Sequence, residues 1–110
     1  MANPWRGEVP LVIDGERRNM RLTLGALAEL EAELGEGSLL DLVQRFEGGR
    51  YCARDVLALV VAGLRGGGWR GDASDLHCAE IEGGPLAAAQ AAALLLARAF
   101  ASPGGRDERA

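Results

Sequence analysis

Few residues in this chain of 110 could perform thiol or metal chemistry. The chain has two cysteines, Cys52 and Cys78, and a single histidine, His77. Three such ligands are one short of a closed structural zinc site. A thiolate at Cys52 would be stabilised if the residue began a helix, and His77 could then act as its base, but no third group can be named to orient such a pair. We favour a structural interpretation, with Cys52 in an N-cap position and Cys78 packed inside.

A glycine-rich segment offers a second candidate chemistry, nucleotide binding. Gly66, Gly68 and Gly71 have the spacing of the dinucleotide fingerprint. That motif works only between a strand and a long helix, where the phosphates meet the helix N-terminus. Here the glycines follow a predicted helix, and Trp69 and Arg70 lie among them, so we predict an ordinary loop between helices. We predict no catalytic residue, no metal and no cofactor, and therefore no enzyme.

The composition of the chain also argues against several classes of binding partner. The formal net charge is −4 and all twelve cationic side chains are arginines, so a phosphate-binding surface and a P-loop lysine are not expected. Hydrophobic residues make up 48% of the chain, yet residues 86–97 form the longest weakly polar stretch, which is too short to span a bilayer. The chain starts without an apolar leader segment. We expect a cytoplasmic protein with free buried thiols that binds neither nucleic acid nor membrane.

The N-terminal part predicts a β-hairpin. Apolar residues alternate with polar ones up to Asp14-Gly15, a pair suited to a type I′ turn. With that pair as the loop, Val9 faces Met20, and Pro10 marks its strand as an edge. The expected apolar face consists of Val9, Leu11, Ile13, Met20 and Leu22. A lone hairpin is marginally stable, so this face must be covered by the helices that follow.

Helical periodicity fills the rest of the chain. Thr23 is the expected N-cap of a first helix, whose apolar stripe is predicted to be Leu24, Leu27, Leu30 and Leu34. A second helix begins near residue 39 and stops at Gly48-Gly49. A third, from Ala53 to Arg65, is apolar on nearly all sides and is predicted to be central.

Two further helices complete the pattern. Asp72 should cap a short helix that includes Leu76, Ala79 and Ile81. Pro85 precedes the last helix, which runs from Leu86 to about Phe100. Its core-facing residues are predicted to be Leu86, Ala89, Ala93, Leu96 and Phe100. The fold class is therefore mainly α, with an N-terminal β-hairpin followed by about five short helices in one compact domain. We place an N-terminal arm at 1–6, the domain at 7–101 and a flexible tail at 102–110.

The order of these segments resembles the gene transfer agent family of phage-tail-like gene clusters. The resemblance covers residues 5 to about 101 and depends on motif order, since each motif alone is structural and unspecific. The motifs are Arg-Gly-Glu-Val at 6–9, Val-Ile-Asp-Gly-Glu-Arg at 12–17, Met-Arg-Leu-Thr-Leu-Gly-Ala-Leu-Ala-Glu-Leu-Glu at 20–31, Ser-Leu-Leu-Asp-Leu at 38–42, Asp-Val-Leu-Ala-Leu at 55–59, Ala-Gly-Leu-Arg-Gly-Gly at 62–67 and Glu-Ile-Glu-Gly-Gly-Pro at 80–85.

The resemblance implies a non-enzymatic tail assembly chaperone, which would hold the tape measure protein and help to recruit tail tube subunits. An alternative is a structural tail component, of the tube or a minor tail part, and a small thiol enzyme is a third, weaker one. Self-association is left open. For a helical client we expect helix-in-groove recognition, with the groove between the hairpin and the adjacent helices. The partner-binding residues we expect are Trp5, Trp69, Leu11, Ile13 and Met20, although the two tryptophans could instead cover the core as lids.

Overall fold

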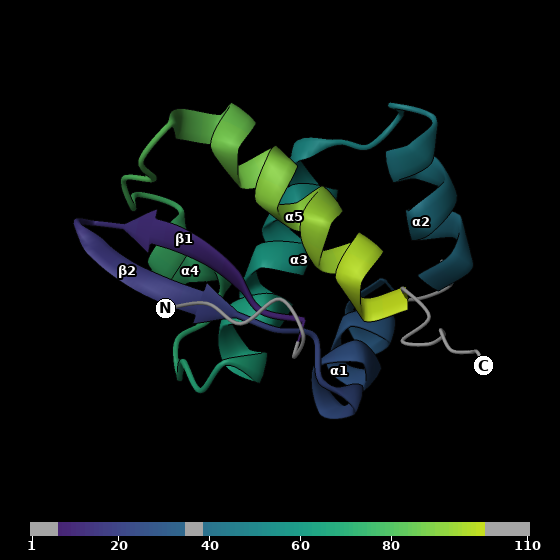
Figure 1. Ribbon diagram of the computed structural model, residues 1–110, viewed down its shortest axis with the longest axis horizontal. Coiled ribbons are helices and arrows are strands. Elements are labelled where there is room, and N and C mark those ends of the chain that lie inside the picture. Colours follow the sequence, from purple (N-terminus) through teal and green to yellow (C-terminus); the bar gives the residue numbers. More distant parts are fainter. Residues whose placement is uncertain (1–6, 35–38, 101–110) are drawn as a thin grey trace.

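The computed structural model describes residues 7–34 and 39–100. It confirms the predicted fold class, because an antiparallel hairpin is followed by five helices in this part of the chain (Figure 1). The elements are β1 (Val9–Ile13), β2 (Glu16–Met20), α1 (Leu24–Leu34), α2 (Leu39–Glu47), α3 (Ala53–Gly66), α4 (Ala73–Leu76) and α5 (Gly84–Phe100). No helix within the described ranges is both long and apolar enough to cross a membrane.

The hairpin has the register that its turn residues predict. Val9 faces Met20, and a two-residue loop joins the strands. Asp14 and Gly15 have φ values of 51° and 80°, and a type I′ turn requires a positive φ at both positions. The predicted apolar face is buried at Val9, Leu11, Ile13 and Met20. A local turn signal and period-two alternation were therefore sufficient to predict this element.

The segment after α4 lies along the free edge of β1. The backbone N–H of Asp14 donates to the carbonyl of Glu80 at 2.7 Å, and that of Glu82 donates to the carbonyl of Val12 at 3.0 Å. Ile81 forms an isolated antiparallel bridge to the same strand. Part of the edge that Pro10 marks is thus covered by backbone pairing, which satisfies polar groups that would otherwise face the core or solvent.

This pairing explains why the fourth helix is shorter than predicted. Asp72 does cap it, and its side chain accepts a hydrogen bond from the backbone of Ser74 at 3.0 Å. However, α4 ends at Leu76, so the prediction that Ala79 and Ile81 are helical is wrong. A single helical turn has little stability by itself, whereas the backbone of residues 80–82 forms hydrogen bonds along β1.

The third helix is the centre of the molecule, as its apolar composition predicts. It packs against α1, α4, α5 and β2. Its buried side chains include Leu59, Val60 and Leu64, each at most 2% exposed. Those three belong to two different core clusters, one around the hairpin and one around α1 and α2. α3 therefore connects the two halves of the core.

Glycines on α3 let the hairpin backbone approach closely. The backbone N–H of Arg21 donates to the carbonyl of Gly63 at 2.9 Å, across the junction between the strand and the helix. A Cβ added at Gly66 would lie 1.9 Å from the carbonyl oxygen of Arg21, and one at Gly67 would lie 2.2 Å from that of Asn19. From the sequence, the glycines after the third helix are interpreted only as part of a loop between helices. In the fold, Gly66 and Gly67 are also the positions at which the hairpin backbone lies against the end of α3.

The predicted faces of two helices are correct only in part. In α1, Leu30 is buried and Leu27 and Leu34 are half-buried, but Leu24 is 84% exposed. In α5, Ala89 and Leu96 are buried as predicted, whereas Leu86, Ala93 and Phe100 are exposed. The rest of the buried face of α5 consists of Ala88, Ala91, Ala92 and Leu95. Because α5 is apolar all round, its sequence contains no polar face that would orient it.

The predicted cap of α1 is confirmed and supplies a direct stability test. The Thr23 hydroxyl accepts a hydrogen bond from the backbone N–H of Ala26 at 3.1 Å. We expect Thr23→Ala to lower the free energy of unfolding by about 1 kcal/mol, because that N–H loses its partner. Thr23→Ser, which keeps the hydroxyl, should retain most of the stability. Urea unfolding of both variants measures the difference, and equal losses would contradict the capping role.

Candidate partner-binding site

Three of the predicted partner-binding residues lie in the hydrophobic core. Leu11, Ile13 and Met20 are 5%, 8% and 0% exposed and belong to the cluster around the hairpin. Met20 is fully buried in the closed fold, whereas Leu11 and Ile13 each line a surface cleft beside the hairpin. Their partner-binding role remains a prediction, and in the closed fold their function is to hold the hairpin on α3 and α5.

Of the two predicted tryptophan anchors, Trp5 lies outside the described residues. Trp69 is half-buried and packs against the same core cluster, which agrees with the lid interpretation. It also lines a cleft of about 200 Å³ beside the hairpin, with Ile13 and Leu76 among the other lining residues. A second hollow, of about 440 Å³, lies between β1 and α5, and its lining includes Leu11 and Leu94. Client binding in a groove next to the hairpin remains a prediction.

A larger apolar pocket opens between α3, α4 and α5. Its volume is about 640 Å³, and its lining includes Tyr51, Val56, Leu76, Ile81 and Leu86. Pockets of this size and lining are typical of sites that bind apolar side chains or small ligands. Sequence reasoning missed this site because its walls come from three segments, within 51–60, 76–81 and 84–89, and each of them also contributes to the core.

Two candidate reactive side chains, Cys52 and His77, line this pocket, and no hydrogen bond joins them in the described structure. Cys52 is the N-cap of α3, as expected. Both cysteines are free but exposed, so the predicted burial of the thiols, including that of Cys78, is wrong. Cys78 follows the end of α4, where the chain turns back over the surface toward β1. Among the described residues, no group of three or more His, Cys, Asp or Glu side chains could hold a metal ion.

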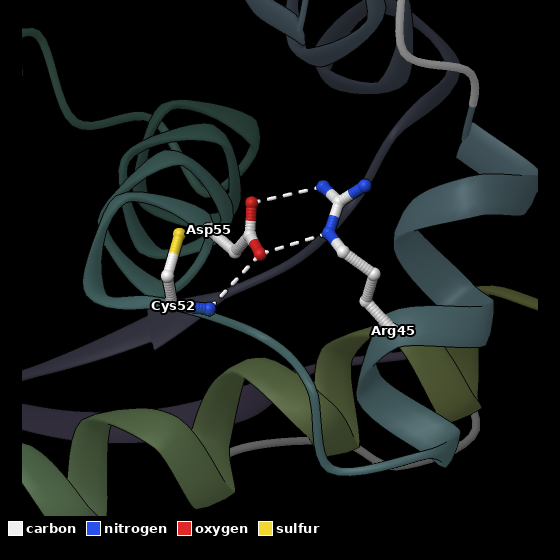
Figure 2. Close-up of polar contacts among 3 residues, drawn as sticks. All are labelled: Arg45, Cys52 and Asp55. Atoms are coloured by element: carbon white, nitrogen blue, oxygen red, sulfur yellow. Dashed lines mark hydrogen bonds and ion pairs between the residues drawn. The ribbon is translucent and has the colours of Figure 1, made fainter.

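A partly buried ion pair joins the end of α2 to the start of α3, next to the segment that lines the pocket. Arg45, near the end of α2, donates from Nε to Asp55 Oδ2 at 3.0 Å and from Nη2 to Asp55 Oδ1 at 2.9 Å (Figure 2). The same Oδ2 accepts the backbone N–H of Cys52 at 3.1 Å. Asp55 is 5% exposed and is the buried charged residue of the core. This two-point contact fixes α2 against α3 with a defined orientation.

The electrostatics of this pair fit a structural role. The hydrogen bonds from the Arg45 guanidinium hold the pKa of the Asp55 carboxyl below its ordinary value, outweighing the effect of burial. The same contact raises the pKa of Arg45. Both groups are therefore charged at neutral pH and bind each other. Sequence reasoning missed the pair, although Asp55 follows Cys52 at the three-residue spacing of a capping box.

The glycine-rich loop after α3 has no phosphate-binding geometry. It follows a helix rather than a strand, and the helix after it, α4, has four residues. Arg65, near the end of α3, donates to the carbonyl of Gly71 at 2.9 Å and to Glu29 Oε1 at 3.0 Å. Its guanidinium is thus engaged in closing the loop onto α1. The expected interpretation of this segment as a connection between helices is consistent with the structure.

Comparison with known proteins gives one family. A family model described as "Phage tail tube protein, GTA-gp10" matches residues 6–102. No curated protein matches the chain, and no solved structure does either. The match covers both the hairpin and all five described helices, and so includes both core clusters and the open pocket.

Proposed function

Because the chain belongs to the GTA-gp10 family of phage tail tube proteins, we propose that it is a structural component of the tail of a gene transfer agent or a related phage-like particle. The observation that carries this proposal is the family match over residues 6–102. Association with other tail components follows from that role. The narrower expectation of a chaperone for the tape measure protein has less support, since the family description names the tube.

The chemistry of the described residues supports an assembly role. Cys52 and His77 are not joined by a hydrogen bond, and the strongest polar contact, between Arg45 and Asp55, is internal to the fold. The surface includes apolar areas that a partner could contact, namely the open pocket and several large exposed side chains on α5. Exposed apolar patches on a small protein typically mark contacts with other proteins. We therefore assign the chain no catalytic activity.

The test is the composition of purified particles. Particles released from a producing strain would be purified on a density gradient, and the chain would be quantified by mass spectrometry relative to the capsid protein. A tail component should be present at a constant ratio in every preparation, and deletion of its gene should give particles without complete tails. Absence of the chain from tailed particles would overturn the structural role.

A second candidate, the tail assembly chaperone, is favoured by the apolar pocket of about 640 Å³. A groove of this kind suits an amphipathic client helix, and the tape measure protein is the client we expect. Ala53, which is exposed and lines the pocket, offers a way to block it. We expect Ala53→Trp to reduce capture of a co-expressed tape measure fragment at least tenfold.

The matched control is Ala28→Trp on the exposed side of α1, far from the lining of the pocket. It should leave capture unchanged. If neither the parent protein nor this control captures any tape measure fragment, the chaperone candidate is wrong. The particle experiment separates the two roles, because a chaperone acts before the particle is complete and should be missing from it.

A further inference from the structure

The outward face of α5 is an uncharged stripe along the helix, apolar at every position except Gln90. Its exposed residues after Pro85 are Leu86, Gln90, Ala93, Leu94, Ala97 and Phe100. Helical geometry places all six within about a third of the circumference, opposite the buried alanines and leucines. Five of these positions, 86, 90, 93, 97 and 100, are separated by alternate steps of four and three. That spacing is the seam along which two helices pack against each other.

A surface helix that is apolar on both faces needs a second partner. The inner face of α5 already packs on α3 and β1. In Figure 1, α5 crosses the front of the molecule, with the hairpin on one side and α2 on the other, so its outer face is open to another molecule. α5 contains no acidic residue, and its single basic residue, Arg98, donates instead to the backbone carbonyl of Glu8.

We infer that α5 forms an antiparallel pair with α5 of a second copy of this chain, related by a two-fold axis at Ala93. The stripe is self-complementary in this arrangement. Leu86 faces Phe100 of the other copy, Gln90 faces Ala97, and the two Ala93 side chains meet at the axis. The small residues at the centre allow the helix backbones to approach, and the large ones close both ends of the interface.

Charge and shape both favour a second copy as the occupant. Each copy has a net charge of −4, so two copies repel each other overall. The stripe itself carries no charge and therefore adds nothing to that repulsion at the contact. Leu86 is part of the rim of the apolar pocket of about 640 Å³. Phe100, which is 52% exposed, would arrive beside that rim from the other copy, about 21 Å along the helix from its own Leu86. Each copy then supplies an aromatic ring to the open pocket of its partner, and the helix dipoles oppose each other.

This inference adds an assembly surface to the proposed tail role, and its test uses purified protein, so its failure leaves the particle experiment unaffected. Sedimentation velocity over a range of concentrations should show a species of twice the 11.6 kDa chain mass. Ala93→Glu places two carboxylates at the axis and should raise the dissociation constant at least tenfold. The control is Ala28→Glu, the same substitution at an exposed position of α1, and it should leave the constant unchanged. Circular dichroism checks that both variants keep their helices.

Cross-linking tests the direction of the helices. In a background in which Cys52 and Cys78 are replaced by serine, Leu86→Cys and Phe100→Cys proteins are oxidised separately and as a mixture. The antiparallel pair predicts disulfide-linked dimers in the mixture and few in either protein alone. The inference is overturned if the parent protein is monomeric at every concentration. It is also overturned if Ala93→Glu does not weaken association, or if identical positions cross-link instead.

Discussion

Gly66→Ala is expected to destabilise the protein by about 3 kcal/mol, the upper range for overpacking in a core. The added methyl group would lie 1.9 Å from the carbonyl oxygen of Arg21 and 3.3 Å from Cβ of Ala26. The strand end cannot move away freely, because the backbone N–H of Arg21 is bound to the carbonyl of Gly63. Relief of the clash therefore requires the hairpin to shift relative to α3, and the packing of Met20 would be lost with it.

The control for this prediction is Gly25→Ala in α1. At Gly25 an added Cβ has nothing closer than Thr23 Oγ1 at 4.0 Å. Alanine there should stabilise the protein by about 0.5 kcal/mol, because the unfolded chain loses conformational freedom. Urea unfolding of the two variants should thus give shifts of opposite sign. If Gly66→Ala unfolds at the same urea concentration as the parent protein, the close approach of the hairpin and α3 is wrong.

Asp55→Asn is expected to cost about 2 kcal/mol, because it removes the counter-charge of Arg45 and weakens hydrogen bonds to a charged group, in a site where Asp55 is buried but the Arg45 side chain is 32% exposed. The effect should be smaller in an Arg45→Met background, where no cation remains to be satisfied. The double-mutant cycle therefore measures the coupling between the two side chains. Glu16→Gln is the matched control. It breaks an ion pair with Arg18 at 2.9 Å, but both side chains are exposed, so little change is expected.

The pH dependence of stability provides an independent check on this pair. The pKa of Asp55 is lowered in the folded protein, chiefly by the hydrogen bonds from Arg45. Its contribution is therefore fully present above the carboxyl's ordinary pKa of about 4, and is lost as the pH falls below that value toward the folded pKa. The stability difference between the parent protein and Asp55→Asn should shrink between about pH 5 and pH 2. A difference that does not change with pH would contradict the charged pair.

The candidate site could be predicted only in part, and the reason differs from residue to residue. Leu11, Ile13 and Met20 were predicted correctly as the inner face of the hairpin, but a sequence does not say whether such a face meets the protein's own helices or a client. Here α3 and α5 cover it. The pair of Arg45 and Asp55 lies ten positions apart on two helices, where no periodic pattern would connect them. The apolar pocket forms only when three segments, within 51–60, 76–81 and 84–89, pack together.

By itself the sequence determined the local structure of this protein. The Asp14-Gly15 turn, the strand register, the Thr23 and Asp72 caps and the existence of the five helices all follow from residues a few positions apart, because the interactions that decide them are short-range. Only the tertiary structure decided which way the apolar helices face. α5 has few polar side chains, so its own sequence does not select the face that is buried. The glycines at the end of α3 allow the backbone at the end of the hairpin to approach α3 closely. That choice depends on packing between distant segments, and it leaves the apolar stripe of α5 on the outside.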